Sequence, residues 1–318
     1  MGSLLATGGA GYIGSHVVRA LRAAGHAVVA YDDLSEGHAD ALLGAPLVQG
    51  DILDTRLLAD TLARHRVEAV LHFAARCYVG ESMEKPALYW RVNRDGTRSL
   101  LAAMAQARCT ALVFSSTCAV YGQPERLPMG EDLPSRPINV YGETKAAMEA
   151  EIAAAADLRH VILRYFNAAG ASADGLLAER HDPETHLIPL ALAAARAGTE
   201  LVINGGDYPT PDGTCVRDYV HVEDLAEAHR LAVERLLAGG GSLLANLGYG
   251  RGFSVRQVVD SVRRVTGLPL ATRIGPRRPG DPPELFARAD RARTELGWVP
   301  RFTDIDTLVA HAWAARRD

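Results

Sequence analysis

The first half of the chain alternates between short apolar runs and longer stretches in which apolar residues recur at helical spacing. Short apolar runs are typical of buried parallel strands, and the helical stretches between them are typical of right-handed crossovers. The pattern predicts strands near residues 4–6, 27–31, 47–49, 69–73, 111–115 and 161–165, and helices near 15–24, 56–65, 87–107 and 141–156. We therefore expect an α/β protein whose first domain, residues 1–167, is a doubly wound parallel sheet.

The pattern changes after Asn167. A long polar loop is followed by a helical stretch at 187–197, a short strand at 201–203 and a loop at 204–213 that is rich in Gly, Pro and Asp. Shorter mixed elements complete the chain. Residues 168–318 are therefore expected to form a smaller C-terminal α/β domain that binds the substrate, with some crossing of the chain between the two domains.

Glycines 8, 11 and 14 lie in a turn between the first strand and the first helix. Glycines let the backbone approach a pyrophosphate, and the amides at the helix N-terminus bind its negative charge. The second strand ends at Asp32, whose carboxylate can accept hydrogen bonds from ribose hydroxyls and would repel a 2′-phosphate. This order predicts a Rossmann-like domain that binds NAD rather than NADP, whereas a glycine turn alone could simply pack a helix against a strand.

Tyr141 and Lys145 are four residues apart in a predicted helix, so they share one of its faces. A free tyrosine, with a pKa near ~10, is a poor base at neutral pH. An ammonium and a positively charged nicotinamide ring nearby would favour the phenolate. The pair predicts a site of proton and hydride transfer.

Composition and charge exclude several other classes of protein. The 318 residues are 48% hydrophobic, which suits one large or two closely packed domains. The net charge is −4, from 34 basic and 38 acidic residues, and the basic residues are dispersed, so neither a nucleic acid nor a membrane is an expected partner. The first residues lack the pattern of a signal peptide, and the four cysteines form no CxxC pair, so a cytoplasmic protein with reduced thiols is expected.

Several histidines and cysteines could suggest other chemistry. His181 and His186 lie in a polar segment whose spacing does not place both on one helix face, so we expect a loop bordering the nucleotide and no metal. His72 and His221 lie in apolar runs and are expected to be core histidines. Cys118 is expected to be a packing residue.

The sequence resembles the UDP-glucose 4-epimerases of the extended short-chain dehydrogenase/reductase superfamily over nearly its whole length. The motifs that carry the resemblance are the glycine loop at 8–16, His72-Phe73-Ala74-Ala75, Val79-Gly80-Glu81-Ser82, Tyr141xxxLys145, Arg164-Tyr165-Phe166-Asn167, the segment 207–222 and Arg277-Arg278-Pro279-Gly280-Asp281. The glycine loop and the Tyr/Lys pair occur throughout the superfamily, whereas the 207–222 segment is far more specific to the epimerases.

The resemblance implies a role for individual residues. The implied catalytic residues are Thr117, Tyr141 and Lys145. The implied contacts to NAD are Gly8, Gly11, Tyr12, Ile13, Gly14, Asp32, Asp51, Ile52, Phe73, Ala74, Ala75, Ser115, Tyr141, Lys145 and Phe166. The implied contacts to a UDP-hexose are Thr117, Tyr141, Asn167, His186, Leu187, Val202, Ile203, Asn204, Arg217, Arg278, Asp281 and Leu285.

The resemblance also implies interconversion of UDP-galactose and UDP-glucose through a 4-keto sugar, and a homodimer formed by the helices at 87–107 and 141–156. Leu285 corresponds to the position that limits the size of the C2 substituent, so weaker turnover of UDP-N-acetylhexosamines is expected. One departure is Cys77, which stands where the family often has a lysine.

Three rival functions remain open at this stage. A sugar-nucleotide 4,6-dehydratase or decarboxylase of the same superfamily would need an acid just after Thr117, where this chain has Cys118 and Ala119. A cofactor-binding regulator without catalysis would have no need of Thr117, Tyr141 and Lys145. A net dehydrogenase or reductase would release NADH.

Overall fold

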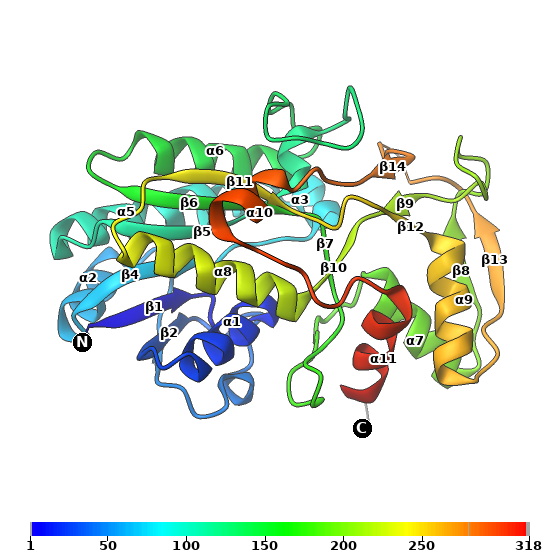
Figure 1. Cartoon of the computed structure of the whole chain (residues 1–318), viewed down its shortest axis with the longest axis horizontal. Helices are drawn as coiled ribbons and strands as arrows, with labels where there is room; N and C mark the ends of the chain where they lie inside the picture. The colour runs from blue at the N-terminus through cyan, green and yellow to red at the C-terminus, as the bar shows by residue number, and fades with distance from the viewer. Residues whose placement is uncertain (1, 279, 316–318) are drawn as a thin grey trace.

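A seven-stranded sheet dominates the computed structural model, which describes residues 2–278 and 280–315 (Figure 1). The order of its strands is β3-β2-β1-β4-β5-β6-β11, and every neighbouring pair is parallel. The strands are β1 (Ser3–Thr7), β2 (Val28–Asp32), β3 (Leu47–Gln49), β4 (Val67–His72), β5 (Ala111–Thr117), β6 (Arg159–Tyr165) and β11 (Leu243–Leu247). The doubly wound parallel sheet that the sequence predicts is confirmed.

Helices cover both faces of this sheet. One face carries α1 (Tyr12–Ala23), α8 (Val222–Leu237) and α10 (Asp290–Leu296), and the other carries α2 (Thr55–Arg64), α5 (Gly96–Ala107) and α6 (Val140–Ala154). In β1, Leu4 and Ala6 belong to one buried cluster and Leu5 belongs to the other. Because successive side chains of a strand point to opposite faces, a strand buried on both faces reads as a continuous apolar run.

The helix predicted at 87–107 is not uniform. It consists of α4 (Pro86–Tyr89), a π-helical segment η2 (Trp90–Asp95) and α5, and it follows the short helix α3 (Val79–Glu84). A π-helical insertion is uncommon and is frequently found at functional sites. The apolar periodicity gave the extent of the helical region but not this change of winding.

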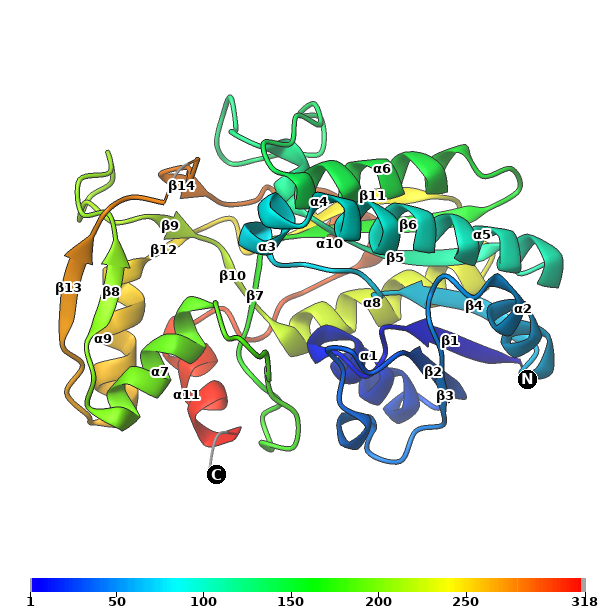
Figure 2. The same ribbon diagram turned by 180° about the vertical axis from the view of Figure 1, so that it is seen from behind.

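A smaller unit lies beside the carboxyl ends of the strands (Figure 2). Its helices α7 (Leu187–Ala197), α9 (Val255–Thr266) and α11 (Ile305–Ala315) pack around a separate apolar cluster. Its short strands form three small sheets, which pair β8 (Leu201–Asn204) with β13 (Thr272–Gly275), β7 (Asn167–Ala169) with β10 (Tyr219–His221), and β9 (Val216–Arg217) with β12 (Phe253–Ser254) and β14 (Glu284–Leu285). Two short 3₁₀ helices, η1 (Ala39–Leu42) and η3 (Cys118–Tyr121), complete the assigned elements.

The chain passes between the two units more than once. After β10 it returns through α8 and β11 to the large sheet, where β11 pairs with β6. Strand β11 of the large sheet thus comes from residues beyond the predicted domain boundary at residue 167. The boundary itself stays a prediction. None of the helices in the described residues is long and apolar enough to span a lipid bilayer.

Candidate active site

The glycine turn between β1 and α1 has the geometry of a phosphate cradle. Gly8 has a φ of +69°, and a Cβ on Gly14 would lie 2.2 Å from the Gly8 carbonyl oxygen, so side chains at these two positions are incompatible with the turn. A Cβ on Gly11, in contrast, would meet only the Gly8 oxygen, at 3.4 Å, among the described residues. Gly11 is the N-cap of α1, so the open side of the turn faces the end of a helix that favours an anion.

Asp32 lies at the carboxyl end of β2, beside this turn. Its Oδ2 accepts the Ala10 N–H at 2.9 Å and its Oδ1 accepts the Leu34 N–H at 2.9 Å. Burial raises the pKa of Asp32, although the two backbone donors oppose that shift. Each carboxylate oxygen retains a further lone pair, so the group is fixed in orientation and still able to accept a ribose hydroxyl. The turn and this carboxylate fit a dinucleotide.

Tyr12 follows the turn, but its side chain forms a hydrogen bond outside the turn. The phenol donates a 2.6 Å hydrogen bond to the Gly170 carbonyl, and burial raises the pKa of this tyrosine well above its ordinary value. The side chain therefore ties the cofactor loop to the segment that follows β7. Any contact of Tyr12 with a pyrophosphate would come from its backbone amide.

The proposed catalytic residues come from two elements that meet at the carboxyl edge of the sheet. Thr117 ends β5, and Tyr141 lies in the first turn of α6, which Asn139 caps by accepting the Gly142 N–H at 2.8 Å. Burial raises the pKa of Tyr141 well above its ordinary value, and a hydrogen bond with Thr117 opposes this shift. The threonine and tyrosine side chains are therefore neighbours, as a proton relay requires.

Lys145 lies one turn further along α6 and is fully buried. Its ammonium donates to the Ser115 carbonyl at 2.6 Å and lies 4.6 Å from the centre of the Phe114 ring. Burial lowers the pKa of Lys145 to about 8, and the nearby Cys77 and Glu149 oppose this shift. These contacts anchor the lysine to β5, and its effect on the Tyr141 phenol stays a prediction for the site with cofactor bound.

Asn93 is a site residue that the sequence reading missed. It lies in the π-helical segment η2, is fully buried, and accepts the Arg76 N–H at 2.8 Å while donating to the Arg76 carbonyl at 3.0 Å. It also donates to Thr144 Oγ1 at 2.9 Å, and Thr144 lies beside Lys145. Asn93 thus joins the loop after β4 to α6. The one feature of the sequence that could have pointed to Asn93 is a polar asparagine inside a helical pattern.

The predicted sugar-nucleotide residues form a second group. Arg217, in β9, forms an ion pair with Asp281 and donates to the Val216 carbonyl at 2.7 Å. Leu285, in β14, pairs in register with Arg217 and packs against the apolar cluster that contains Phe166. Because Phe166 follows directly on β6, this contact connects the second group to the catalytic edge of the sheet.

The remaining predicted contacts are distributed over the smaller unit. Asn167 donates its backbone N–H to the Asp218 carbonyl at 3.0 Å, and Arg278 is exposed. His186 is the N-cap of α7, which begins at Leu187. Val202, Ile203 and Asn204 lie together on β8. Leu187 packs against the apolar cluster that contains Ile203, whereas Asn167 and Arg278 lie on neither α7 nor β8.

The buried histidines and the thiols follow the sequence expectations. His72 bridges Thr7 and Thr97 at 2.7 and 3.1 Å, and His221 contacts His311 at 2.9 Å, so both are core histidines with polar partners. The four cysteines are free thiols. Cys118 packs against the apolar cluster of Phe166 and is a packing residue, as expected.

The loop at 178–186 is irregular, as predicted. Because it is not a helix, the helical spacing of His181 and His186 does not decide whether their side chains lie together. The chain folds so that one possible ligand atom from each of Glu179, His181, Glu184 and His186 lies within 4.8 Å of the others. Glu179, which the sequence reading did not single out, is buried at the centre of this group.

The fold and the arrangement of the site define the class of protein. The chain belongs to the NAD dependent epimerase/dehydratase family, whose pattern it matches over residues 4–248.

Among its relatives, the chain is 50% identical to a UDP-glucose 4-epimerase of Azospirillum brasilense, over 99% of this chain and 92% of that protein. It is 48% identical to the UDP-glucose 4-epimerase of Halalkalibacterium halodurans, over 98% of this chain and 94% of that protein. The crystal structure of UDP-glucose 4-epimerase from Brucella ovis in complex with NAD superimposes with a TM-score of 0.96 at 50% identity, covering 98% of both chains.

Proposed function

We propose that this protein is a UDP-glucose 4-epimerase that interconverts UDP-galactose and UDP-glucose with tightly bound NAD. The observation that carries the proposal is the placement of Thr117, at the end of β5, beside Tyr141 in the first turn of α6, one helical turn from the buried Lys145. The glycine turn and Asp32 lie at the same edge and fit the cofactor. The full-length identity to epimerases supports this function over others in the family.

The residues divide the reaction between them. When bound, NAD would supply reversible hydride transfer at C4 of the hexose, and the glycine turn and Asp32 would hold it. Tyr141, as phenolate, takes the proton of the C4 hydroxyl directly or through the Thr117 hydroxyl, and gives it back after the sugar has turned. Lys145 would hold the nicotinamide ribose and supply positive charge near the phenolate.

The nucleotide must be held firmly while the sugar turns. Arg217 and Arg278 suit this task because forked guanidinium donors match the oxygens of a diphosphate. In the structure Asp281 accepts from Arg217 and so holds its side chain in place. The backbone at Asn167, His186, Leu187 and the β8 residues would line the rest of the UDP site.

A dehydratase or decarboxylase reaction is disfavoured by the residue after Thr117. Burial raises the pKa of the Cys118 thiol to about 12, and the side chain packs among apolar residues. A group of this kind does not exchange a proton with carbon at neutral pH. Replacing a carboxylic acid by this thiol leaves epimerisation as the reaction that the remaining residues can perform.

Leu285 would set the preference for the sugar. It is partly buried between Arg217 and the apolar cluster of Phe166, where a larger side chain would reduce the space beside the catalytic edge. We infer that UDP-glucose and UDP-galactose are the main substrates and that the N-acetylhexosamine pair is turned over more slowly.

We further propose a homodimer in a reducing, cytoplasmic compartment. The region 86–107 and α6 lie side by side at the surface of the large unit, where they could form a four-helix interface (Figure 2). The four free thiols agree with a reducing compartment. Light scattering of the purified protein should give twice the mass of the 34.0 kDa chain.

The direct test is a chromatographic assay of the purified protein with UDP-galactose, with UDP-glucose as the expected product. Denaturation of the same sample should release NAD(H) and little NADP(H), because Asp32 opposes a 2′-phosphate. Accumulation of a dehydrated, decarboxylated or net-oxidised sugar nucleotide would overturn the proposed reaction. Recovery of mainly NADP(H) would overturn the cofactor assignment alone.

A further inference from the structure

The loop that leads into α7 gathers two glutamates and two histidines. Glu179, His181, Glu184 and His186 each place one carboxylate oxygen or imidazole nitrogen within 4.8 Å of the other three. We call this group the 179–186 cluster; the proposed epimerase reaction uses it only through His186, whose backbone would line the UDP site, and assigns no role to the other three side chains. Two imidazoles and two carboxylates are a donor set that divalent transition metals accept.

The donor atoms lie close together, and the shortest separations are hydrogen bonds between a histidine and a glutamate. Nδ1 of His181 and Nδ1 of His186 lie 3.0 and 2.8 Å from Oε1 of Glu179. Nδ1 of His186 lies 3.1 Å, and Nδ1 of His181 4.0 Å, from Oε1 of Glu184. Zinc bonds of about 2.0–2.2 Å to nitrogen and oxygen place tetrahedral ligands roughly 3.3–3.5 Å apart, so small side-chain shifts would produce the coordination geometry.

The burial and charge of the cluster also favour a cation. The side chain of Glu179 is 7% exposed and that of Glu184 is 15% exposed, so two carboxylates occupy a region with little solvent. Buried carboxylates require compensating positive charge, which either a divalent ion or protons on the imidazoles can supply. The side chain of His186 is 41% exposed, which leaves a path by which an ion could enter.

Surrounding contacts help to fix the orientation of two of the four side chains, Glu184 and His181. The Thr185 and His186 N–H groups donate to Oε1 of Glu184 at 2.8 and 2.9 Å. The His181 ring makes edge contacts with Tyr12 and Tyr78, with centroids 6.3 and 5.6 Å away. Such outer contacts orient metal ligands and raise affinity.

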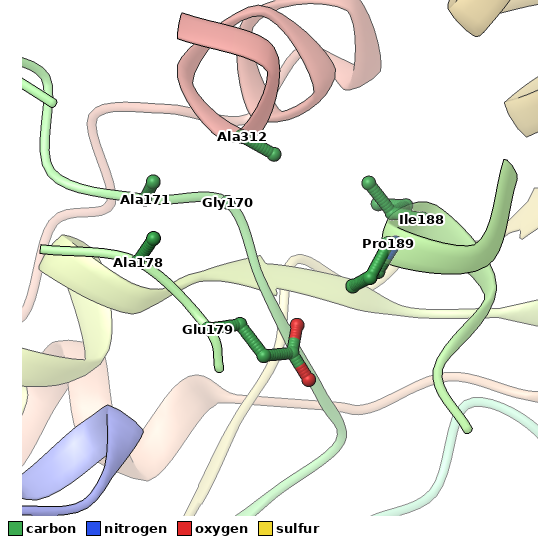
Figure 3. Close-up of a pocket in the computed structure, with 7 residues that line it drawn as sticks. All are labelled: Gly170, Ala171, Ala178, Glu179, Ile188, Pro189 and Ala312. Atoms are coloured by element: carbon green, nitrogen blue, oxygen red, sulfur yellow. The ribbon is translucent and has the colours of Figure 1, made fainter. Parts of the chain in front are cut away.

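Glu179 also borders a small cavity (Figure 3), whose other lining residues are Gly170, Ala171, Ala178, Ile188, Pro189 and Ala312. Glu179 is the one charged side chain among these seven. The cavity has a volume of about 10 Å³, which is the space of roughly one water molecule.

We propose that the 179–186 cluster binds one divalent transition-metal ion, of the class represented by Zn²⁺, through Glu179, His181, Glu184 and His186. The ion would cross-link the irregular loop immediately before α7 and, through the ring contact of His181 with Tyr12, fix that loop against the start of α1. Its role is structural, because the donors belong to one segment and no reacting group is among them.

The test uses tag-free holoenzyme that has been dialysed against a chelator and then titrated with Co²⁺, whose visible absorption reports the coordination geometry. We expect one equivalent per chain to bind with the intense bands of a tetrahedral site, and Zn²⁺ to displace it. Thermal unfolding should shift upward with Zn²⁺ concentration, because a ligand that binds only the folded state stabilises it.

Two variants and a control locate the ion. His181→Asn and Glu179→Gln should each weaken Co²⁺ binding at least tenfold and abolish the tetrahedral bands, while His65→Asn, at a histidine in the loop after α2, should leave both unchanged. Circular dichroism identifies a variant that fails to fold, and Glu184→Gln then replaces it. The absence of saturable binding in the parent protein, or equal binding by the parent and the cluster variants, would overturn the proposal.

Discussion

Tyr141 obtains its proposed role from neighbours and not from the phenol alone. Thr117 is the neighbour in the catalytic set that opposes the effect of burial on the pKa of Tyr141. Thr117→Val should therefore slow turnover as well, but less than loss of the tyrosine, because water can take the place of the hydroxyl in the relay.

Tyr141→Phe should lower the turnover of UDP-galactose by two or more orders of magnitude, the scale typical of a lost general base. The fold and the amount of bound NAD should not change, and both can be measured by circular dichroism and by extraction of the cofactor. Tyr249→Phe is the matched control, because it removes a buried phenol that donates to Asp224 at 2.7 Å, away from the catalytic residues. If Tyr141→Phe kept a near-normal rate, another group would be the base.

Leu285→Tyr should suppress turnover of UDP-N-acetylglucosamine more than that of UDP-glucose. The added bulk would fill the space between Arg217 and the cluster of Phe166, and a packing difference of this size discriminates by about 1–3 kcal/mol. The ratio of kcat/KM values for the two substrates measures the effect. An equal loss for both substrates would remove Leu285 from sugar selection.

At the scale of single residues, the sequence predicted those whose role depends on residue type and local spacing. Gly8, Gly14, Asp32 and the Tyr/Lys pair are of this kind. Asn93 was not predicted because it contacts Thr144, 51 positions away, and no local pattern contains such a pairing. Glu179 was not predicted for a different reason: its partners His181 and His186 are close in sequence, but only the irregular fold of the loop turns all three side chains together.

The turn between β1 and α1 is the element whose geometry allows the least variation. Gly14→Ala would place a Cβ 2.2 Å from the Gly8 carbonyl oxygen, so the first turn of α1 would have to move. We expect a loss of stability of about 1–3 kcal/mol, the range for overpacking, and a lower content of NAD in the purified protein. Thermal unfolding and cofactor extraction measure the two effects.

Gly80→Ala provides the contrast. Gly80 lies in α3, and a Cβ there would meet no heavy atom within 4 Å among the described residues. Alanine is favoured over glycine in helices by up to about 1 kcal/mol, so this variant should be as stable as the parent or more stable. If Gly14→Ala were as stable as Gly80→Ala, the clash at Gly14 would be relieved without cost to stability.

Elements of the large sheet up to β6 were predicted to within a few residues, because strands buried on both faces and amphipathic crossover helices each have a distinct periodicity. The π-helical segment η2 was missed because its apolar pattern resembles that of an α-helix. The short strands β7, β9, β10, β12 and β14 have two or three residues each, which is too few for a period to be visible.

The buried histidines of the whole molecule predict how its stability depends on pH. Burial lowers the pKa of His72 and His221 to about 3, and that of His16 and His229 to about 4. The unfolded chain binds protons at these sites below pH ~6.5, whereas the folded chain does not. The free energy of unfolding should therefore fall as the pH decreases from 6.5 to 4.

Each site accounts for about 2 kcal/mol of destabilisation between pH 7 and pH 5, by linkage. Asp218 acts in the opposite direction, because burial raises its pKa to about 6 and the folded state then binds a proton that the unfolded state does not. Urea unfolding at several pH values measures the sum. His229→Gln should flatten the acidic slope, whereas His65→Gln, at a partly exposed histidine, should not. An unchanged slope in His229→Gln would contradict the shifted pKa.

The pairing of β11 with β6 has a consequence for folding during synthesis on the ribosome. Until residues 243–247 have been synthesised and have left the exit tunnel, the edge of β6 presents unpaired backbone groups along an apolar strand. Such an edge can pair with other chains, and a nascent chain of this length is exposed to that hazard for many seconds. The large sheet therefore cannot be completed vectorially from its N-terminal part, and productive folding waits until about three quarters of the polypeptide has emerged.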